Sequence, residues 1–331
     1  MHLALIGTGR IGRYHAALLT STPGVTAITV ADVDQPRAAA VAADLGIEAA
    51  ASVTAAITAA DAVVIAAATD AHADLIMEST AAGKPTFCEK PIALDLASTR
   101  TVVDHVTATG ATVHMGFQRR FDPGYRAARQ LVATGELGTI YVIRMVGHDP
   151  QPPHEAYIPV SGGLFRDFGV HDFDAIRYVT GDEVVEVYAD GAVLGFPVFA
   201  TYGDIDTGVA ILTLGSGARA LLSSTRHNPH GYDIRMELFG SGDSAVVGWD
   251  ERTPLRSLEP GGPQLPADPY PDFQARFRTA YQRELAAFVE VAAGDRPSPC
   301  TVVDALEALR IAVACDRSRA EHRPVRLEEV A

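Results

Sequence analysis

Gly7-Thr8-Gly9-Arg10-Ile11-Gly12 is the stretch that decides the fold, because it follows a short apolar run at 2–6 and precedes apolar residues at helical spacing. The first glycine permits a tight turn, the second lets backbone N–H groups approach a pyrophosphate, and the third lets the helix pack against the strand. The pattern predicts a dinucleotide-binding turn. We expect direct cofactor contacts from Gly7, Thr8, Gly9, Arg10, Ile11 and Gly12.

Asp32 ends the next apolar run, 25–31, about 20 residues beyond the glycine turn. A carboxylate here accepts hydrogen bonds from both ribose hydroxyls of adenosine and repels a 2′-phosphate. The alternative is that Asp32 caps the helix that begins near Pro36, but Asp34 is the better-placed cap. No arginine lies directly beside Asp32, and Arg37 is expected in the next helix. The pattern favours NAD over NADP.

Strand and helix patterns continue to alternate as far as residue 120. Further strands are expected at 61–67, 86–89 and 111–115, and helices at 38–45, 73–82 and 95–107. Such alternation predicts a doubly wound parallel sheet, so we expect an α/β Rossmann domain over residues 1–120. The loop that follows the 61–67 strand contains Thr69 and His72, both expected to contact the cofactor. His72 stands at the start of a helix, where a histidine can instead make a local structural hydrogen bond.

Phe87-Cys88-Glu89-Lys90-Pro91 contains the carboxyl end of the 86–89 strand. Ligands of open α/β sheets bind outside the carboxyl ends of the strands, so the Lys90 ammonium can point at a ligand. Pro91 fixes the backbone behind it, and this proline can be cis. The alternative for Lys90 is an ordinary solvated loop lysine. We expect Glu89 and Lys90 on the cofactor and Lys90 also on the substrate.

The pattern changes after residue 120. β-rich runs separated by glycine-containing turns are found at 139–146, 184–193, 205–214, 218–225, 233–239 and 244–249. They predict a large, mainly antiparallel open sheet in a C-terminal α+β domain, residues 121–331, that binds substrate and forms oligomers. Helices are expected at 125–134, 273–293 and 302–318, and the last of these can pack back on the first domain.

Asp167 and His171 are four residues apart in a segment with helical character. On a helix this spacing puts both side chains on one side, which suits an acid–base pair. The alternative is an ordinary surface pair, but the neighbours Leu164, Phe168 and Phe173 leave little purely polar surface. The spacing therefore favours a shared functional site.

Composition excludes several classes of protein. The formal net charge of −14 argues against a nucleic-acid partner or an anionic membrane surface. No apolar run reaches the roughly 20 residues of a membrane span. Cys88, Cys300 and Cys315 form no C-x-x-C pair and have no histidine at ligand spacing, so we expect reduced core thiols and no metal site. A cytoplasmic protein is expected.

Taken together, the glycine turn, the Glu89-Lys90-Pro91 tripeptide and the Asp167 to His171 pair resemble the glucose-fructose oxidoreductase/inositol dehydrogenase family over essentially the whole chain. Two segments, 116–123 and 161–174, look most like its inositol 2-dehydrogenase branch. The resemblance implies that Lys90, Asp167 and His171 are catalytic. It also implies substrate contacts by Arg119, Asp149 and Tyr232, with the alignment at Asp149 crossing a variable loop. A homodimer or homotetramer is implied as well.

The expected activity is NAD-dependent oxidation of a secondary alcohol of a cyclic polyol, myo-inositol or another inositol, to the inosose. His171 would be the general base, because an imidazole titrates near neutral pH. Lys90 would bind the reacting oxygen. Asp167 would orient Lys90 and His171 or balance their charge. A sugar dehydrogenase or 3-keto-sugar reductase of the same family, and a redox-inactive NAD-binding sensor, are the alternatives.

Two departures from the inositol branch bear on substrate identity: Pro159 replaces a frequent lysine, and the stretch 226–230 is not the usual sequence. On the substrate side, Arg119 and Tyr232 come from distant parts of the chain. We expect them to converge with Asp149 on the open face of the second domain, where polar groups can bind hydroxyls.

Overall fold

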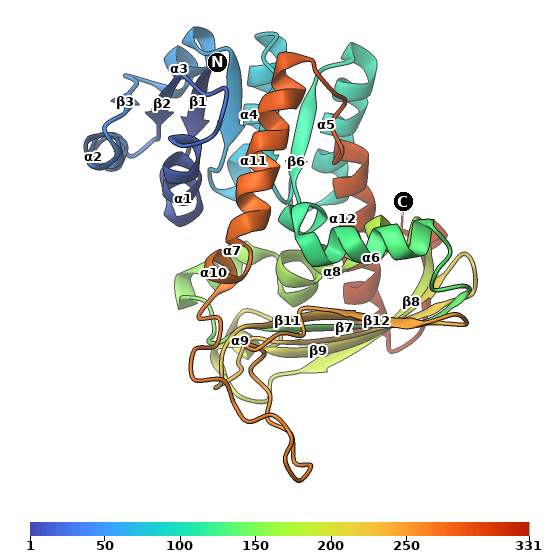
Figure 1. Cartoon of the computed structure of the whole chain (residues 1–331). Helices are drawn as coiled ribbons and strands as arrows, with labels where there is room; N and C mark the ends of the chain where they lie inside the picture. Colours follow the sequence, from blue (N-terminus) through green and yellow to red (C-terminus); the bar gives the residue numbers. More distant parts are fainter. Residues whose placement is uncertain (331) are drawn as a thin grey trace. The chain divides into compact units, whose positions relative to one another are not determined.

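The computed structural model describes residues 1–330, which divide into two compact units (Figure 1). The first unit contains Met1–Phe121 and Thr279–Glu307, and the second contains Asp122–Arg278 and the chain from Ala308 onward. Residues 279–307, which the sequence analysis placed in the second domain, therefore belong to the first unit. Neither unit is one continuous piece of chain.

A six-stranded parallel sheet forms the centre of the first unit, in the order β3-β2-β1-β4-β5-β6. Its strands are β1 (His2–Ile6), β2 (Ala27–Ala31), β3 (Glu48–Ala49), β4 (Ala62–Ile65), β5 (Thr86–Glu89) and β6 (Val113–Gly116). Strands β1, β4 and β5 are almost wholly buried, as expected of strands covered on both faces. The strand order reverses between β1 and β4, which confirms the doubly wound fold and marks the ligand-binding edge.

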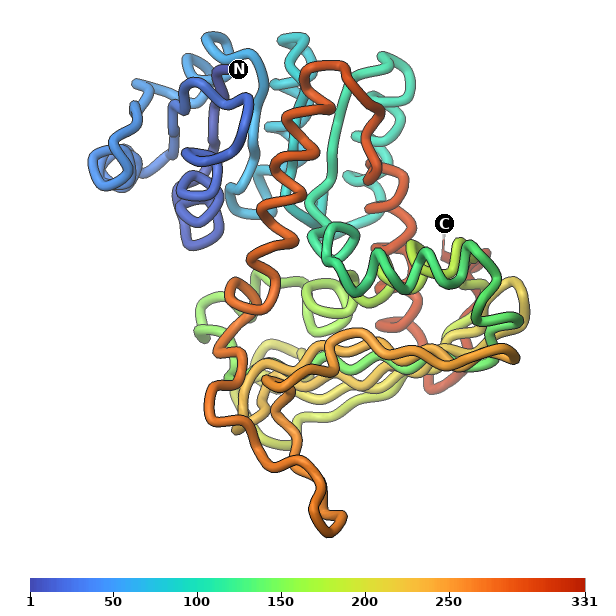
Figure 2. The backbone as a smooth tube through the Cα atoms, in the orientation of Figure 1, coloured from blue at the N-terminus to red at the C-terminus, as the bar shows by residue number. Residues whose placement is uncertain are grey.

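Helices connect these strands: α1 (Arg10–Leu19), α2 (Gln35–Leu45), α3 (Val53–Ala59), α4 (His72–Ala81) and α5 (Leu96–Thr109). Asp34 caps α2 by accepting from the Arg37 N–H, as expected. The orange-to-red chain in Figure 2, α11 (Arg278–Ala293) and the start of α12 (Val302–Glu321), completes the unit. In α11, the Phe288 ring lies 5.7 Å from that of Phe87 on β5, so this late segment supplies part of the core of the first unit.

The second unit is built on a seven-stranded sheet in the order β12-β11-β7-β10-β9-β8-β13. Its strands are β7 (Ile140–His148), β8 (Val184–Ala192), β9 (Thr207–Leu214), β10 (Arg219–Thr225), β11 (Asp233–Gly240), β12 (Ser244–Val247) and β13 (Val325–Arg326). Only the β7–β10 pair is parallel, so the sheet is mainly antiparallel, as predicted. Helices α6 (Pro123–Ala133) and α8 (Val170–Thr180) cover one face (Figure 1).

Several short helices in the second unit were not expected from the sequence. The segment after β7 contains a 3₁₀ turn, Glu155–Tyr157, and leads into α7 (Ile158–Ser161); α9 (Val198–Thr201) follows β8. The helix expected at 273–293 is interrupted at Phe277, between α10 (Phe273–Arg276) and α11. The Phe277 backbone has φ −107° and ψ 17°, outside helical geometry, and its side chain is fully buried.

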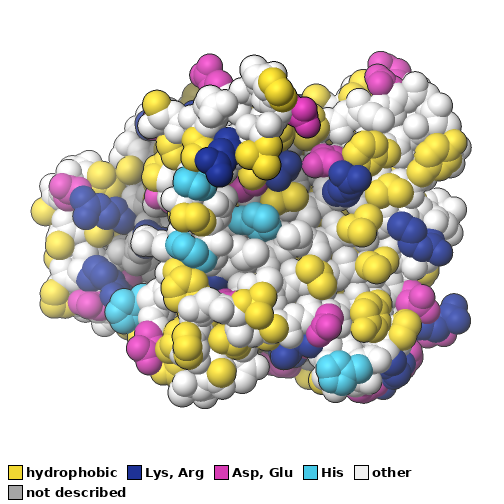
Figure 3. All heavy atoms as spheres, turned by 90° about the horizontal axis from the view of Figure 1, so that it is seen from below, with side chains coloured by type: hydrophobic (Ala, Val, Ile, Leu, Met, Phe, Trp, Pro, Cys, Tyr) yellow, Lys and Arg dark blue, Asp and Glu magenta, His cyan; other side chains and the backbone are white. Residues whose placement is uncertain are grey.

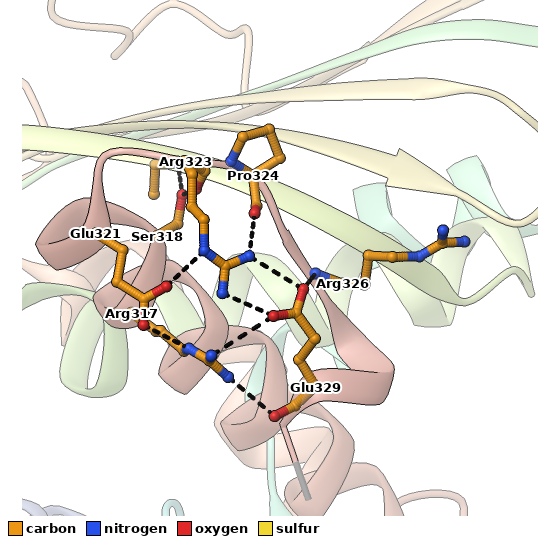
Figure 4. A network of polar contacts seen from close by, with 8 residues as sticks. Arg317, Ser318, Glu321, Arg323, Pro324, Arg326 and Glu329 are labelled. Atoms are coloured by element: carbon orange, nitrogen blue, oxygen red, sulfur yellow. Dashed lines mark hydrogen bonds and ion pairs between the residues drawn. The ribbon is translucent and has the colours of Figure 1, made fainter.

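The end of α12 and the segment after it are held by a charged network (Figure 4). Arg323 donates to Glu329 at 2.7 Å and to Glu321 at 2.6 Å, and Arg317 also reaches Glu321 at 2.8 Å. The Arg323 hydrogen bond holds the pKa of Glu329 at about 2. Ser318 adds a link to the sheet by accepting from the Ala189 N–H of β8. Exposed ion pairs are individually weak, but here several share partners and fix the edge strand β13.

All three cysteines are reduced and buried, as expected. Burial raises the pKa of the Cys88 and Cys315 thiols, which makes them unreactive. Within residues 1–330, no helix has the length and apolar character needed to cross a membrane.

Candidate functional site

The glycine turn has the shape of a diphosphate cradle. Gly7 has φ +93°, and a Cβ there would lie 2.5 Å from the Ala67 backbone; a Cβ on Gly12 would lie 1.9 Å from the Gly7 carbonyl oxygen. By contrast, a Cβ on Gly9 would meet nothing within 4 Å, and Gly9 caps α1 with no side-chain hydrogen bond. The backbone is thus closely packed behind the turn and open in front of it. The backbone N–H groups in the first turn of α1 point the positive end of the helix toward this opening, which suits a pyrophosphate.

Asp32 follows β2 and is almost completely buried beside this turn. Its Oδ2 accepts from the Thr8 N–H at 2.6 Å and from the Thr8 hydroxyl at 2.9 Å, and its Oδ1 accepts from the Asp34 N–H at 2.9 Å. Although burial acts to raise it, hydrogen bonds from Arg37, Asp34 and Thr8 lower the pKa of Asp32 to about 2. Asp32 is therefore an anion at every physiological pH.

Arg37 gives a result that the sequence analysis did not foresee. Its Nη2 donates to Asp32 Oδ1 at 2.7 Å and its Nε to Oδ2 at 3.3 Å, while its side chain remains 48% exposed. No arginine is adjacent to Asp32 in the sequence, but the folded chain places Arg37 beside it, because the first turn of α2 brings Arg37 back to the end of β2. The argument from the absence of a neighbouring arginine is therefore wrong. Asp32 already accepts about as many hydrogen bonds as a carboxylate can, so ribose hydroxyls must displace Arg37.

The other half of this edge is the end of β5, two strands from β1 and so about 10 Å along the sheet edge. Lys90 follows β5 directly, and the Lys90–Pro91 peptide is cis, which the sequence analysis allowed. Glu89 Oε1 lies 2.6 Å from His15 Nε2, a buried pair that links β5 to α1. One carboxylate oxygen of Glu89 is thus engaged inside the protein, which limits the cofactor contact expected of it.

His72 joins two of the loops at the edge. Its Nδ1 lies 2.7 Å from the Pro91 carbonyl oxygen and its Nε2 lies 3.1 Å from that of Ala67. The side chain is buried, and burial lowers the pKa of His72, so the neutral ring donates to one carbonyl at a time. Both ring nitrogens thus make the local structural contacts that the sequence analysis gave as the alternative, and a cofactor contact of His72 stays a prediction. Thr69 begins the 3₁₀ turn Thr69–Ala71 after β4 and is half-buried.

In the second unit, sheet register brings expected site residues to one edge. β7 and β10 run parallel with His148 opposite Thr225, so Asp149 and Arg226 emerge side by side. The Asp149 N–H donates to the Thr225 carbonyl at 3.0 Å. β11 starts opposite His148 and runs the other way, which puts Tyr232 at the same edge. Asp149 and Tyr232 are thus neighbours because of strand register, although 83 positions separate them in sequence (232 minus 149).

Asp167 lies on a π-helical turn, Phe165–Gly169, that leads directly into α8. The single α-helix assumed for Asp167 and His171 is therefore corrected: His171 is in the first turn of α8, while Asp167 belongs to the wider turn before it. Asp167 Oδ1 accepts from the Tyr157 hydroxyl at 2.9 Å, and Oδ2 accepts from Arg226 Nη2 at 2.9 Å. Both carboxylate oxygens are engaged, and His171 remains half-buried.

The expected open placement is wrong for Arg119 and Tyr232. Arg119 is 2% exposed and belongs to the first unit, and Tyr232 is 5% exposed with its ring edge-on to Phe277. The reason for Tyr232 is local: Gly231 has φ +128°, and the Tyr232 N–H donates to the Tyr270 carbonyl, which turns the residue into the protein. Asp149 keeps 20% of its side chain exposed.

The sequence analysis did not foresee the contacts of three contributors: Arg37, Tyr157 and Arg226. Arg226 carried a signal, because it begins the stretch noted as unusual for the inositol branch, but that observation did not indicate ion pairs with Asp167 and Asp149. Nothing in the sequence pattern indicated a role for Tyr157. Among residues 1–330, no group of three or more His, Cys, Asp or Glu side chains could hold a metal ion.

A doubly wound sheet with an open glycine turn, a buried acid after β2 and a lysine after β5 defines an NAD-binding oxidoreductase domain. Comparisons with known proteins agree. Residues 1–117 match the oxidoreductase family with an NAD-binding Rossmann fold, and residues 125–246 match the GFO/IDH/MocA C-terminal domain. The chain belongs to the GFO/IDH/MocA family of oxidoreductases, and its cofactor is NAD.

Several relatives that match over nearly the full length are named as inositol dehydrogenases. The chain is 34% identical to myo-inositol 2-dehydrogenase of Thermotoga maritima, with 100% of this chain and 99% of the relative covered. It is 35% identical to scyllo-inositol 2-dehydrogenase (NAD(+)) of Bacillus subtilis, covering 98% and 96%. The crystal structure of scyllo-inositol dehydrogenase from Lactobacillus casei, with bound NAD(H) and scyllo-inositol, superposes with a TM-score of 0.88 at 28% identity over 99% of each chain.

Proposed function

We propose that this enzyme oxidises one ring hydroxyl of an inositol to the ketone, with myo-inositol as the first candidate. The observation that carries the proposal is the cluster of Asp149, Asp167 and Tyr157 around Arg226, since carboxylate and phenol groups at one sheet edge suit a substrate made of hydroxyls. The named relatives act on myo- and scyllo-inositol at nearly equal identity, so the preferred isomer is open to measurement.

The proposed mechanism divides the work between the two units. The bound nicotinamide supplies the hydride acceptor. His171 takes the hydroxyl proton, and Lys90 donates a hydrogen bond to the same oxygen and favours its alkoxide character. Asp167 balances the charge that forms on His171, while Tyr157 and Arg226 hold its carboxylate. As the hydride leaves the carbon, the alkoxide becomes the carbonyl.

Substrate recognition is proposed to rest on Asp149, which is partly exposed, with Arg119 and Tyr232 as supporting contacts. Because the last two are buried, we expect each to reach the substrate with only its polar end. Tyr232→Phe should raise KM for the polyol several-fold and leave NADH affinity unchanged. An unchanged KM would remove Tyr232 from the substrate contacts.

The test of the whole proposal is an absorbance assay at 340 nm with NAD and a panel of inositols and hexoses. We expect an inositol to give the highest kcat/KM. His171→Ala and Lys90→Ala should each lose about 10²–10⁴-fold in turnover while still binding NADH, and the double variant should lose much less than the product of the two. Normal hydride transfer in single turnovers of His171→Ala would overturn the assignment of the base, and a hexose as best substrate would overturn inositol.

We also propose that the free face of the second sheet joins copies of this chain as a homodimer or homotetramer. Five large apolar side chains on this face are at least 40% exposed: Tyr141, Tyr188, Val209, Ile211 and Leu221. Figure 3 shows hydrophobic side chains, in yellow, scattered over the molecule seen from below. A shallow apolar groove lies between several of them. Light scattering should show a multimer that the double variant Val209→Asp/Ile211→Asp dissociates. Leu258→Asp, an exposed apolar site outside the sheet, is the control. A monomeric wild-type protein would contradict this proposal.

A cytoplasmic location is proposed on the basis of the three reduced, buried thiols, which suit a reducing compartment. Cell fractionation tests it: the enzyme should remain with the cytosolic fraction, and recovery with an extracytoplasmic fraction would refute it.

A further inference from the structure

Arg226 is held in place from both its backbone and its side chain. It is the first residue after β10, and its N–H donates to the Asp206 carbonyl at 2.8 Å, just before β9. Its side chain is only 3% exposed, and the guanidinium carbon lies 5.8 Å from the centre of the Phe168 ring. An arginine this deeply buried is uncommon unless its charge is used, because removing a guanidinium from water is costly.

The Arg226 guanidinium links two acids from different elements. Nη2 donates to Asp167 Oδ2 at 2.9 Å, on the π-helical turn, and Nη1 donates to Asp149 Oδ2 at 3.4 Å, after β7. Although burial acts to lower it, the charges of Asp167 and Asp149 raise the pKa of Arg226, so the group stays a cation. One buried positive charge is thus shared by two carboxylates, with Asp204 a further acid close enough to contribute.

These two acids have different duties in the proposed function, on which this inference rests. Asp167 belongs to the proton-transfer set and Asp149 to the substrate contacts. We propose that Arg226 is a positioning residue that fixes Asp167 and Asp149 relative to each other and so links turnover to the choice of polyol isomer. A planar guanidinium suits this duty because its separate N–H groups hold two carboxylates at a set angle, which a lysine ammonium cannot do.

The proposal differs from a merely structural ion pair in what its loss would change. A structural pair, once removed, lowers stability and the folded fraction only. A positioning residue changes KM, kcat and isomer preference in the protein that remains folded, since both acids gain freedom together. Displacements of about 1 Å in a catalytic group cost about 10²-fold in rate.

The experiment compares Arg226→Gln and Arg226→Lys with wild-type enzyme on myo-inositol and scyllo-inositol, two substrates that differ in the configuration of one hydroxyl. We expect Arg226→Gln to lose about 10- to 100-fold in kcat and to raise KM, with the ratio of kcat/KM for the two isomers moving toward one. Arg226→Lys should recover part of kcat but not the isomer ratio. NADH affinity should stay within about 2-fold, because the cofactor contacts lie in the first unit.

The pH dependence of kcat/KM distinguishes the two roles, because a loss of stability alone does not change it. The groups facing Arg226 are Asp149, Asp167, Asp204 and the Tyr157 hydroxyl on Asp167. Without the guanidinium these carboxylates hold protons more tightly, so the acid limb of kcat/KM should move to higher pH in Arg226→Gln. Added guanidinium ion should restore part of the activity to Arg226→Gln by filling the vacated space.

Arg177→Gln is the control, because the Arg177 side chain is only 9% exposed and pairs with Glu183 at 2.6 Å near the end of α8, away from Asp149 and Asp167 in the sequence. It should lower stability without changing the isomer ratio. An unchanged kcat, isomer ratio and pH profile in folded Arg226→Gln would overturn the positioning role while leaving the proposed function intact. If Arg226→Gln fails to fold, an isomer ratio retained in Arg226→Lys would overturn the positioning role in the same way. Wild-type enzyme inactive on every inositol would instead overturn the proposed function.

Discussion

Replacing Asp32 with alanine tests how this fold selects its cofactor. In the free protein the carboxylate is shared by Thr8, Asp34 and Arg37. Thr8 is buried and Asp34 donates through its backbone N–H, so the half-exposed Arg37 side chain is the partner that can move aside. Two ribose hydroxyls bonded to a charged carboxylate contribute about 3 kcal/mol at the low end. Displacing the half-exposed Arg37 pair costs up to about 1 kcal/mol. The net advantage of about 2 kcal/mol corresponds to about a 30-fold weaker binding of NADH in Asp32→Ala.

Asp32→Ala should have the opposite effect on the affinity for NADPH. Loss of the carboxylate removes its repulsion of the 2′-phosphate and frees the Arg37 guanidinium to pair with that phosphate. We expect NADPH affinity to rise, so that the preference for NADH falls by more than the roughly 30-fold lost on the NADH side. Fluorescence titration with NADH and NADPH measures both affinities on one sample.

Arg37→Gln is the control for this argument. With Asp32 intact, it removes a competitor of the ribose, so NADH should bind at least as well as to wild type, and NADPH no better. In the double variant Asp32→Ala/Arg37→Gln the gain for NADPH should disappear. NADH affinity that stays within about 3-fold of wild type in well-folded Asp32→Ala would refute the placement of the ribose on Asp32.

Three further changes test separate features. Gly12→Ala should abolish NADH binding, since its Cβ would lie 1.9 Å from the Gly7 carbonyl oxygen; retained affinity in a titration would show that the turn can rearrange. Oxidation by wild-type enzyme should rise with pH through an ionisation that His171→Ala lacks, and an identical rise in the variant would exclude His171 as its source. Burial, with the charges of Arg296 and Arg120, lowers the pKa of His114 to about 3. The unfolded chain therefore takes up this proton first, near pH 6.5, and stability falls by up to about 1.4 kcal/mol per pH unit from there down to about 3. His114→Phe should reduce that loss in urea unfolding at pH 4 and 7, and an unchanged difference between the two pH values would contradict it.

Local patterns predicted the first unit well. The strand at Thr86–Glu89 has the expected bounds, and the order strand, glycine turn, helix, acid was readable because each step depends on neighbours in sequence. Residues 279–307 were misplaced because a helical pattern does not reveal which sheet it will cover. The break at Phe277 was missed for a related reason, since tertiary burial of one ring overrides a continuous helical pattern.

The sequence predicted which types of residue form the candidate site, but not which of these residues contact one another. Asp149 and Tyr232 meet through strand register, which a resemblance can suggest and composition cannot. The ion pairs of Arg37 and Arg226 depend on where long side chains turn once the backbone is in place. Such contacts leave no periodic signal in the sequence.

The return of residues 279–307 to the first unit has a consequence for how the enzyme is made. The β6 residue Met115 donates its N–H to the Cys300 carbonyl, and Phe288 packs on Phe87, so this sheet lacks part of its cover until a late segment arrives. On the ribosome, synthesis proceeds at about 5–20 residues per second, and domains commonly fold in the order of their emergence. Here most of the cofactor-binding unit is translated first, but it can be completed only after strands β7 to β12 of the second unit have been synthesised.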